Sequence, residues 1–250
     1  MIISKSFIVD LAKQGGKIAY SNLNKTKKIS YKKKHEVVTD IDRKIEKFIV
    51  KEIKKKYPCH GFLGEEFNYG ESDSDYVWVI DPIDGTNNYV RNFPHFCCSI
   101  AVLKKGEPII TAIYDPCKEQ MFFSELNKGA YLNDKKIKVS ETKLLKDAVV
   151  ELSESDKSDK ELSIIKVLTN KAYRLRIVGS TALSLCYVAA GFIDARVKLT
   201  VGKYDVAGGA LLVREAGGVV TDFKGEVSGW ERGGNYSNNR FTESIIDSIF

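Results

Sequence analysis

The strongest constraint in the sequence is an apolar segment that stops abruptly at two carboxylates. Residues 77–90 read VWVIDPIDGTNNYV, and the β-branched and aromatic residues at their start predict a buried β-strand. Asp81 and Asp84 follow this strand, with Pro82 between them. Because proline fixes φ at about −65°, it stiffens a turn that can bring both carboxylates to one point. We therefore expect the strand to end at a cation site.

The residues after this turn suit an anion. Gly85 has no Cβ where a ligand would approach, and Thr86 can begin a helix whose free N–H groups face a phosphate. The alternative is a strand followed by an ordinary aspartate-capped turn, because Asp and Pro are common turn formers. The pattern Asp-Pro-x-Asp alone does not separate the two interpretations, but the full string favours the cation site.

Two further segments place acids beside glycine. In FLGEEF (residues 62–67), Glu65 and Glu66 follow an apolar pair and a glycine. Only one of them can face a given metal, because neighbouring strand residues point to opposite sides. In KYDVAGG (residues 203–209), Asp205 precedes small residues that open an apolar helix and allow a close approach. Read alone, the first segment is most often a surface turn and the second a helix cap.

Together these segments supply only oxygen ligands. The ligands are the side chains of Glu65, Asp81, Asp84 and Asp205 and the backbone carbonyl of Ile83. Oxygen-only sites suit hard cations such as Mg²⁺, and a pair of such ions is a recurring device for phosphoryl hydrolysis. Four converging acids also need a cation to compensate their charge. The sequence therefore predicts a magnesium-dependent reaction at phosphate.

Composition excludes several classes of protein. The chain of 250 residues is 43% hydrophobic and 29% charged, which is typical of a folded soluble protein. It has no apolar run near the ~20 residues that span a bilayer, so we expect no membrane partner. The five cysteines form no Cys-x-x-Cys pair, and the three histidines share no ligand spacing with them. These features predict a reduced, cytoplasmic protein without a zinc site.

The positive charge of the chain is concentrated near its start. There are 39 basic and 33 acidic side chains, a net charge of +6, and many of the lysines lie in residues 25–56. A nucleic-acid-binding surface is one interpretation, and it predicts binding that weakens with salt. No recognition helix, RNA-stacking motif or zinc finger accompanies the lysines, so a solvated helix face is favoured and a nucleic-acid partner is not expected. A further interpretation also stays open, in which the lysines form a positive rim that attracts a small phosphorylated substrate.

The apolar patterns divide the chain into two halves of one compact unit. Residues 1–150 predict an α+β half, with amphipathic helices over 3–20 and 39–57 followed by strands. Residues 151–250 predict an α/β half, since helix, glycine and strand signals alternate there. The polar stretch 151–161 is the expected joint between the halves.

Three motifs in this order and spacing are similar to those of a known family. GEE (64–66), DPIDGTNNYV (81–90) and DVAGG (205–209) resemble the inositol monophosphatase-like family of Mg²⁺-dependent, often lithium-sensitive phosphatases. The resemblance covers nearly the whole chain, and the central motif is highly specific. It implies the layered αβαβα sandwich of the sugar phosphatases, two to three Mg²⁺ ions in each active site, and a homodimer.

The resemblance also implies a role for each acid. Glu65, Asp81 and the Ile83 carbonyl would hold the activating metal. Asp81, Asp84 and Asp205 would hold the second, beside the leaving-group oxygen. A third, weaker ion would bind largely through waters near Glu65.

The same resemblance implies which groups act on water and phosphate. Thr86, with Glu65, would orient the water that attacks phosphorus in line, and the Gly85 and Thr86 amides would grip the phosphate. Asp42, in the string TDID, matches an acidic position that supports the metal cluster, with Thr39 assisting it.

The substrate contacts include one departure from the family pattern. Gly179, Ser180 and Thr181 fall where members of the family contact the substrate ring. Inositol-specific members carry a glutamate about seven residues before the aspartate of the DVAGG motif, and this chain has Lys198 there. A cation at this position favours a second phosphate or carboxylate over a neutral polyol. The alternative is that Lys198 points to solvent or that the local alignment slips by one residue.

The resemblance therefore predicts a metal-dependent phosphomonoesterase for an inositol monophosphate-type substrate. The alternatives within the family are fructose 1,6-bisphosphate, adenosine 3′,5′-bisphosphate, NADP and histidinol phosphate. A catalytically silent homologue is a further alternative, and the complete acid set together with Thr86 argues against it.

Overall fold

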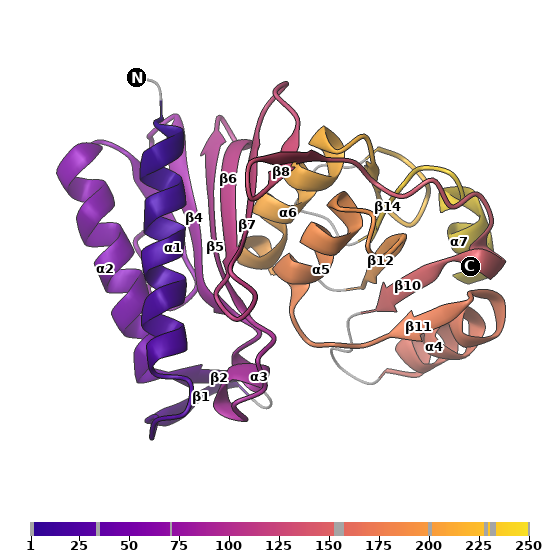
Figure 1. Cartoon of the computed structure of the whole chain (residues 1–250), viewed down its shortest axis with the longest axis horizontal. Coiled ribbons are helices and arrows are strands. Elements are labelled where there is room, and N and C mark those ends of the chain that lie inside the picture. Colours follow the sequence, from indigo (N-terminus) through magenta and orange to yellow (C-terminus); the bar gives the residue numbers. More distant parts are fainter. Residues whose placement is uncertain are drawn as a thin grey trace.

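Two large β-sheets alternate with layers of helices across the molecule. The computed structural model describes residues 3–33, 36–70, 72–152, 158–199, 202–227, 230 and 234–249. In Figure 1 the layers follow one another from left to right as helices, sheet, helices, sheet and helices. This order confirms the predicted αβαβα sandwich.

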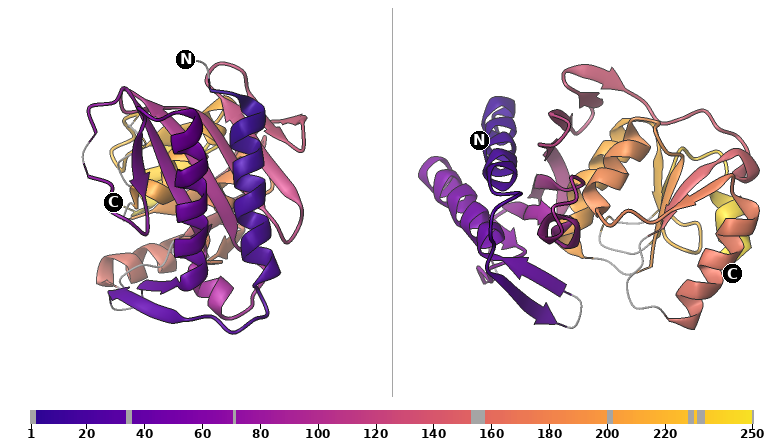
Figure 2. Two further views of the ribbon diagram at one scale, coloured as in Figure 1. Left: turned by 90° about the vertical axis from the view of Figure 1, so that its left-hand side faces the viewer. Right: turned by 60° about the horizontal axis from the view of Figure 1, so that its bottom comes forward.

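The first helical layer consists of α1 (Lys5–Ser21) and α2 (Asp40–Lys56), where the sequence predicts amphipathic helices. The two helices run side by side across one face of the first sheet (Figure 2). α2 begins at a capping box, in which Thr39 accepts from the Asp42 amide and the Asp42 carboxylate accepts from the Thr39 amide at 3.0 Å. Its apolar stripe is buried in the core against the sheet and consists of Ile41, Ile45, Ile49 and Ile53.

The first sheet has seven strands in the order β3-β4-β5-β6-β7-β8-β9. β3 is parallel to β4, and the other neighbours are antiparallel. The strands are β3 (Gly61–Gly64), β4 (Tyr76–Asp84), β5 (Cys97–Lys104), β6 (Glu107–Asp115), β7 (Gln120–Glu125), β8 (Ala130–Leu132) and β9 (Lys135–Ile137). A separate hairpin and a short helix complete this half, namely β1 (Ile29–Lys33), β2 (Glu36–Thr39) and α3 (Thr86–Val90).

The second sheet has five strands in the order β11-β10-β12-β14-β13. Its strands are β10 (Val149–Leu152), β11 (Arg174–Arg176), β12 (Ala195–Lys198), β13 (Val219–Thr221) and β14 (Gly234–Ser237). The 3₁₀ turn η1 (Leu145–Asp147) precedes it, and its outer face carries α4 (Asp159–Lys171) and α7 (Thr242–Ile249) (Figure 1).

The change from one sheet to the other comes earlier than the expected joint. The first sheet ends at Ile137 and the second begins at Val149. Within the stretch 151–161, the first two residues already belong to β10 and the last three to α4, while residues 153–157 lie outside the described part of the chain. The polar composition of this stretch therefore marks a connection between a strand and a helix of the same sheet unit.

The middle helical layer binds the two sheets together. It consists of α5 (Thr181–Ala189) and α6 (Lys203–Glu215), and one hydrophobic cluster joins these helices to residues of both sheets. Small residues allow close packing here. A Cβ on Gly209 would lie 2.5 Å from the Leu185 Cβ, so α6 and α5 touch almost at their backbones. The N-termini of both helices are thereby brought to the end of β4.

We predict that Gly209→Ala destabilises the protein by about 1–3 kcal/mol, because the added methyl group must push Leu185 away. Urea unfolding followed by circular dichroism measures the change. The exposed helix substitution Ser163→Ala is the control and should change stability by less than about 0.5 kcal/mol. In the double variant Gly209→Ala with Leu185→Ala the contacts to Leu185 Cγ and Cδ1 are removed but the contact to its Cβ remains, so only part of the cost of Gly209→Ala should be relieved. A Gly209→Ala variant as stable as the wild type would contradict this close approach of the two helices.

Candidate active site

Three aspartates converge where β4 ends and α6 begins. Asp81, Asp84 and Asp205 each place a carboxylate oxygen within 4.8 Å of the other two. Two of them come from the strand β4 and the third comes from the first turn of α6, 121 residues after Asp84 in the chain.

 The fold rather than a local motif brings Asp205 to the two aspartates of β4.

A β-bulge explains how two aspartates three residues apart face the same point. In a regular strand such residues point to opposite faces. Here Asp81 lies opposite Ser99 and Asp84 lies opposite Cys97, so the stretch of β4 has one residue more than the matching stretch of β5. The extra residue returns Asp84 to the side of Asp81. Pro82 fits this interruption, since it has no N–H to give to the strand ladder. The sequence predicts a turn here, and the structure instead continues the strand through a bulge.

Asp84 is held by the N-terminus of α5. Its carboxylate accepts hydrogen bonds from the Thr181 amide at 3.1 Å, from the Ala182 amide at 2.8 Å, and from the Ser180 hydroxyl. Free N–H groups and the helix dipole both favour a negative charge at this end of a helix. Ser180 and Thr181 thus orient a carboxylate, a function that the sequence did not indicate. Their predicted contact with the substrate stays a prediction.

Asp81 is the least compensated member of the cluster. It is buried, and among the described residues its Oδ1 atom has no hydrogen-bond partner. Burial, and then the nearby charges of Glu65, Asp84 and Asp205, raise the pKa of Asp81 well above its usual range. An acceptor-only oxygen in this setting is matched by a cation. The donor set of hard carboxylate oxygens therefore fits Mg²⁺ or a similar ion.

Glu65 reaches the cluster from the neighbouring strand. Its amide donates to the Ile80 carbonyl at 3.1 Å, which places it beside Asp81 at the end of the parallel pair β3 and β4. Glu46 of α2 fixes the turn that follows Glu65. Its carboxylate accepts hydrogen bonds from the amides of Glu66, at 2.8 Å, and Phe67, at 3.1 Å. Gly64 is needed because a Cβ there would collide with the Glu46 carboxylate.

Glu46 was not identified from the sequence as a residue of the site, although its spacing from Asp42 indicates such a role. It lies four residues after Asp42 on α2, and both acids are fully buried. Residues four apart share one face of a helix. Two acids at this spacing beside an apolar stripe are costly to bury and therefore indicate a constrained role.

Asp42 and Thr86 are linked by their side chains. The Thr86 hydroxyl lies 2.8 Å from the Ile83 carbonyl and 3.3 Å from an Asp42 oxygen. Burial raises the pKa of Asp42 to about 6, although hydrogen bonds from Thr39 act in the opposite direction. The capping box that begins α2 thus also positions the carboxylate that faces Thr86.

Gly85 lies between the acids and Thr86, at a position where only glycine fits. Its φ is +96°, and a Cβ would lie 2.9 Å from the His95 carbonyl oxygen. Gly179 also has a positive φ and lies against the side chain of Asn88, whose amide donates to the Val178 carbonyl at 2.9 Å. The residues before α5 are therefore tied directly to α3.

Lys198 points into the cluster and not to solvent. It is only 5% exposed, and its ammonium lies 2.9 Å from an Asp205 oxygen and 3.0 Å from the Thr181 hydroxyl. The alternative of a solvent-facing lysine is therefore wrong. Its partner in this structure is a predicted metal ligand.

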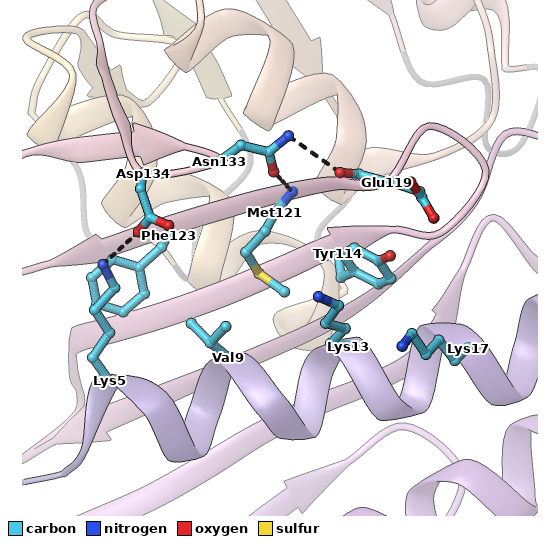
Figure 3. Close-up of a pocket in the computed structure, with 10 residues that line it drawn as sticks. All are labelled: Lys5, Val9, Lys13, Lys17, Tyr114, Glu119, Met121, Phe123, Asn133 and Asp134. Carbon is cyan, nitrogen blue, oxygen red and sulfur yellow. Dashed lines mark hydrogen bonds and ion pairs between the residues drawn. The ribbon is translucent and has the colours of Figure 1, made fainter.

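Three lysines of α1 line a separate cavity of about 420 Å³. Figure 3 shows this cavity between α1 and the strands of the first sheet, with Lys13 and Lys17 on the helix side and Lys5 paired with Asp134. It contains none of the predicted site residues. Lys34 and His35 of the lysine-rich segment lie outside the described residues.

Similarity to known proteins identifies the family. The profile of the Inositol monophosphatase family matches residues 5–249. The chain belongs to the inositol monophosphatase family. A protein named Nus factor SuhB from Xylella fastidiosa is 40% identical over 226 residues, which are 88% of this chain and 82% of that protein.

Two further relatives show how closely this member of the inositol monophosphatase family follows the others. A fructose-1,6-bisphosphatase/inositol-1-monophosphatase of Thermotoga maritima is 34% identical over 227 residues, which are 90% of this chain and 86% of that protein. The crystal structure of the extragenic suppressor protein suhB from Bartonella henselae has a TM-score of 0.94 at 30% identity, and the match covers 98% of this chain and 97% of that chain. Family membership supports a phosphatase. Within the described residues, no helix combines the length and apolarity needed to cross a membrane.

We predict that the metal-free protein loses stability as the pH rises from about 4 to about 6. The pKa of Asp42 is about 6 in the folded state, whereas the usual pKa of an aspartate is 3.8. The folded state therefore binds more protons than the unfolded state within this window. The difference corresponds to about 3 kcal/mol for this group. Urea unfolding in the presence of EDTA at several pH values measures it.

The variant Asp42→Asn should show a shallower fall of stability across the same window, because its side chain does not titrate. Asp10→Asn, on the exposed side of α1, should keep the wild-type slope. An unchanged slope in Asp42→Asn would assign the pH dependence to other groups.

Proposed function

We propose that this chain is a Mg²⁺-dependent phosphomonoesterase that hydrolyses a small phosphorylated metabolite of the inositol monophosphate type. The observation that carries the proposal is the convergence of Asp81, Asp84 and Asp205 at the bulge of β4, with Glu65 beside them. Such a concentration of buried negative charge costs folding energy and is useful only with cations. Membership of the inositol monophosphatase family supports the same chemistry.

The chain offers ligands for two to three cations. Glu65, Asp81 and the Ile83 carbonyl would hold one ion, and Asp84 and Asp205, together with Asp81, would hold another. Bound divalent cations would stabilise the charge that develops on the phosphoryl group and make water nucleophilic at neutral pH. The hydrogen bonds that α5 gives to Asp84 keep this carboxylate in place before the cations bind.

The neighbouring side chains would orient the attacking water and the phosphate. The Thr86 hydroxyl donates its proton to Asp42 or to the Ile83 carbonyl, which leaves its lone pairs for the water. Glu65 would accept a proton from the same water. The amides of Gly85 and Thr86, next to the acids, would bind the phosphate oxygens.

A bisphosphate is the second candidate substrate, and Lys198 favours it. This residue brings a positive charge to a position where inositol-specific members carry an acid, and the relative from Thermotoga maritima is named for both activities. The substrates to compare are inositol 1-phosphate, fructose 1,6-bisphosphate, adenosine 3′,5′-bisphosphate, NADP and histidinol phosphate.

We also propose that the enzyme is a cytoplasmic, lithium-sensitive homodimer. An exposed aromatic surface near the site supports the dimer. Phe93 and Phe192 are 53% and 57% exposed, and ring contacts through His95 and Tyr187 connect them. Aromatic residues at this exposure are common at protein interfaces.

We predict phosphate release with Mg²⁺ from at least one of these substrates and none with EDTA. Asp84→Asn should lower the rate by at least about 10–100-fold while the fold is retained, because it removes a ligand charge and no core packing. Asp134→Asn, an exposed aspartate away from the cluster, is the matched control and should keep the full rate. Phosphate release is measured for each variant, and circular dichroism checks the fold.

Full activity in Asp84→Asn would contradict the assignment of the metal ligands. A wild-type protein that releases no phosphate from any substrate would instead favour a role without catalysis. Nucleic-acid binding that falls with salt and is insensitive to Mg²⁺ and to Asp84→Asn would identify a separate binding function.

A further inference from the structure

We propose that Lys198 is a built-in counter-ion of the acid cluster, which stabilises the cluster before divalent cations bind and competes with them for Asp205. The inference rests on the proposed function, because it assumes that Asp205 is a metal ligand. It assigns to Lys198 a role in cation affinity, in addition to any contact with the substrate.

The position of Lys198 in the fold directs its charge at the cluster. It is the last residue of β12, and its side chain is 7% exposed. The ammonium contacts Asp205 at 2.9 Å and the Thr181 hydroxyl at 3.0 Å. Both partners belong to the first turns of the two middle helices, so the lysine is enclosed where these helices meet β12.

The neighbouring Arg196 does not provide the same compensation. It is buried on β12 and pairs with Glu151 of β10 at 2.5 Å. Its second contact is the Thr181 hydroxyl, at 3.0 Å, which therefore accepts from two cationic side chains. Because Glu151 balances the charge of Arg196, the charge of Lys198 is left for the acid cluster.

The charge of Lys198 is important because the acid cluster is strongly negative. Asp81, Asp84, Asp205 and Glu65 carry up to four negative charges, and Lys198 offsets one of them. A divalent cation on Asp205 must share its carboxylate with the ammonium or displace it. Two positive charges a few ångströms apart repel each other strongly in a site with little water.

Two opposite effects on the protein follow. In the absence of divalent cations, Lys198 stabilises the fold, since Asp205, whose side chain is 25% exposed, would otherwise face the buried carboxylates of Asp81 and Asp84 without a compensating charge. In their presence it lowers the affinity of the site. When a cation takes Asp205, the Thr181 hydroxyl remains as an acceptor for the ammonium, so Lys198 can stay in place.

The variants Lys198→Met and Lys118→Met separate this role from the loss of an ordinary ion pair. Lys118 pairs with an aspartate too, the buried Asp115, at 2.9 Å, but that aspartate is not part of the acid cluster. Mg²⁺ binding is measured by titration calorimetry, and the unfolding temperature is measured with EDTA and with saturating Mg²⁺.

We expect Lys198→Met to bind Mg²⁺ on the order of tenfold more tightly than the wild type. Its unfolding temperature should be lower than that of the wild type in EDTA, and the increase produced by Mg²⁺ should be larger. Lys118→Met should bind Mg²⁺ with wild-type affinity and show a wild-type increase. Lys198→Arg keeps the charge and should also bind with an affinity close to that of the wild type.

An affinity and a Mg²⁺-induced temperature increase in Lys198→Met equal to those of the wild type would overturn the inference. If Lys198→Met does not fold, Lys198→Gln takes its place with the same expectations. Asp84→Asn distinguishes the two proposals. If Asp84→Asn abolishes Mg²⁺ binding while Lys198→Met behaves as the wild type, only the role of Lys198 is wrong. If Asp84→Asn binds Mg²⁺ as well as the wild type does, the metal centre and the proposed function are wrong as well.

Discussion

Mutual repulsion among the carboxylates at the end of β4 is the constraint on which the rest of the site depends. Asp81 and Asp84 are buried and Asp205 lies partly exposed beside them, and burial and neighbouring charges raise the pKa values of the first two. The fold offsets part of this charge through the N-terminus of α5 and through Lys198. One Asp81 oxygen still has no donor among the described residues, and a cation is the partner that the proposed function assigns to it.

The layered fold is what brings these groups together. α5 and α6 lie between the two sheets, and each begins at the acid cluster. Close packing at Gly209 keeps the helices side by side. The first sheet supplies the acids of β4, and the second supplies Lys198 from β12. A change in the packing of the middle layer would therefore alter the relative positions of these side chains as well as the stability of the core.

Local patterns in the sequence predicted much of this, and contacts between distant segments account for what they missed. Helical periodicity located α1 and α2, and the acids of the central motif were predicted to be metal ligands, two of which converge with Asp205 in the structure. The bulge of β4 was not foreseen, because it is defined by register with β5 and not by the motif alone. The pairing of Lys198 with Asp205 likewise depends on how β12 meets α6, which no local pattern encodes.

The most direct test of this account is a crystal structure of the protein grown with Mn²⁺, in which anomalous scattering locates the ions. The account predicts anomalous peaks at the acid cluster, one in contact with Asp81 and Glu65 and one in contact with Asp84 and Asp205. The absence of any peak at these carboxylates at a saturating concentration of Mn²⁺, in a crystal where they are accessible, would contradict it.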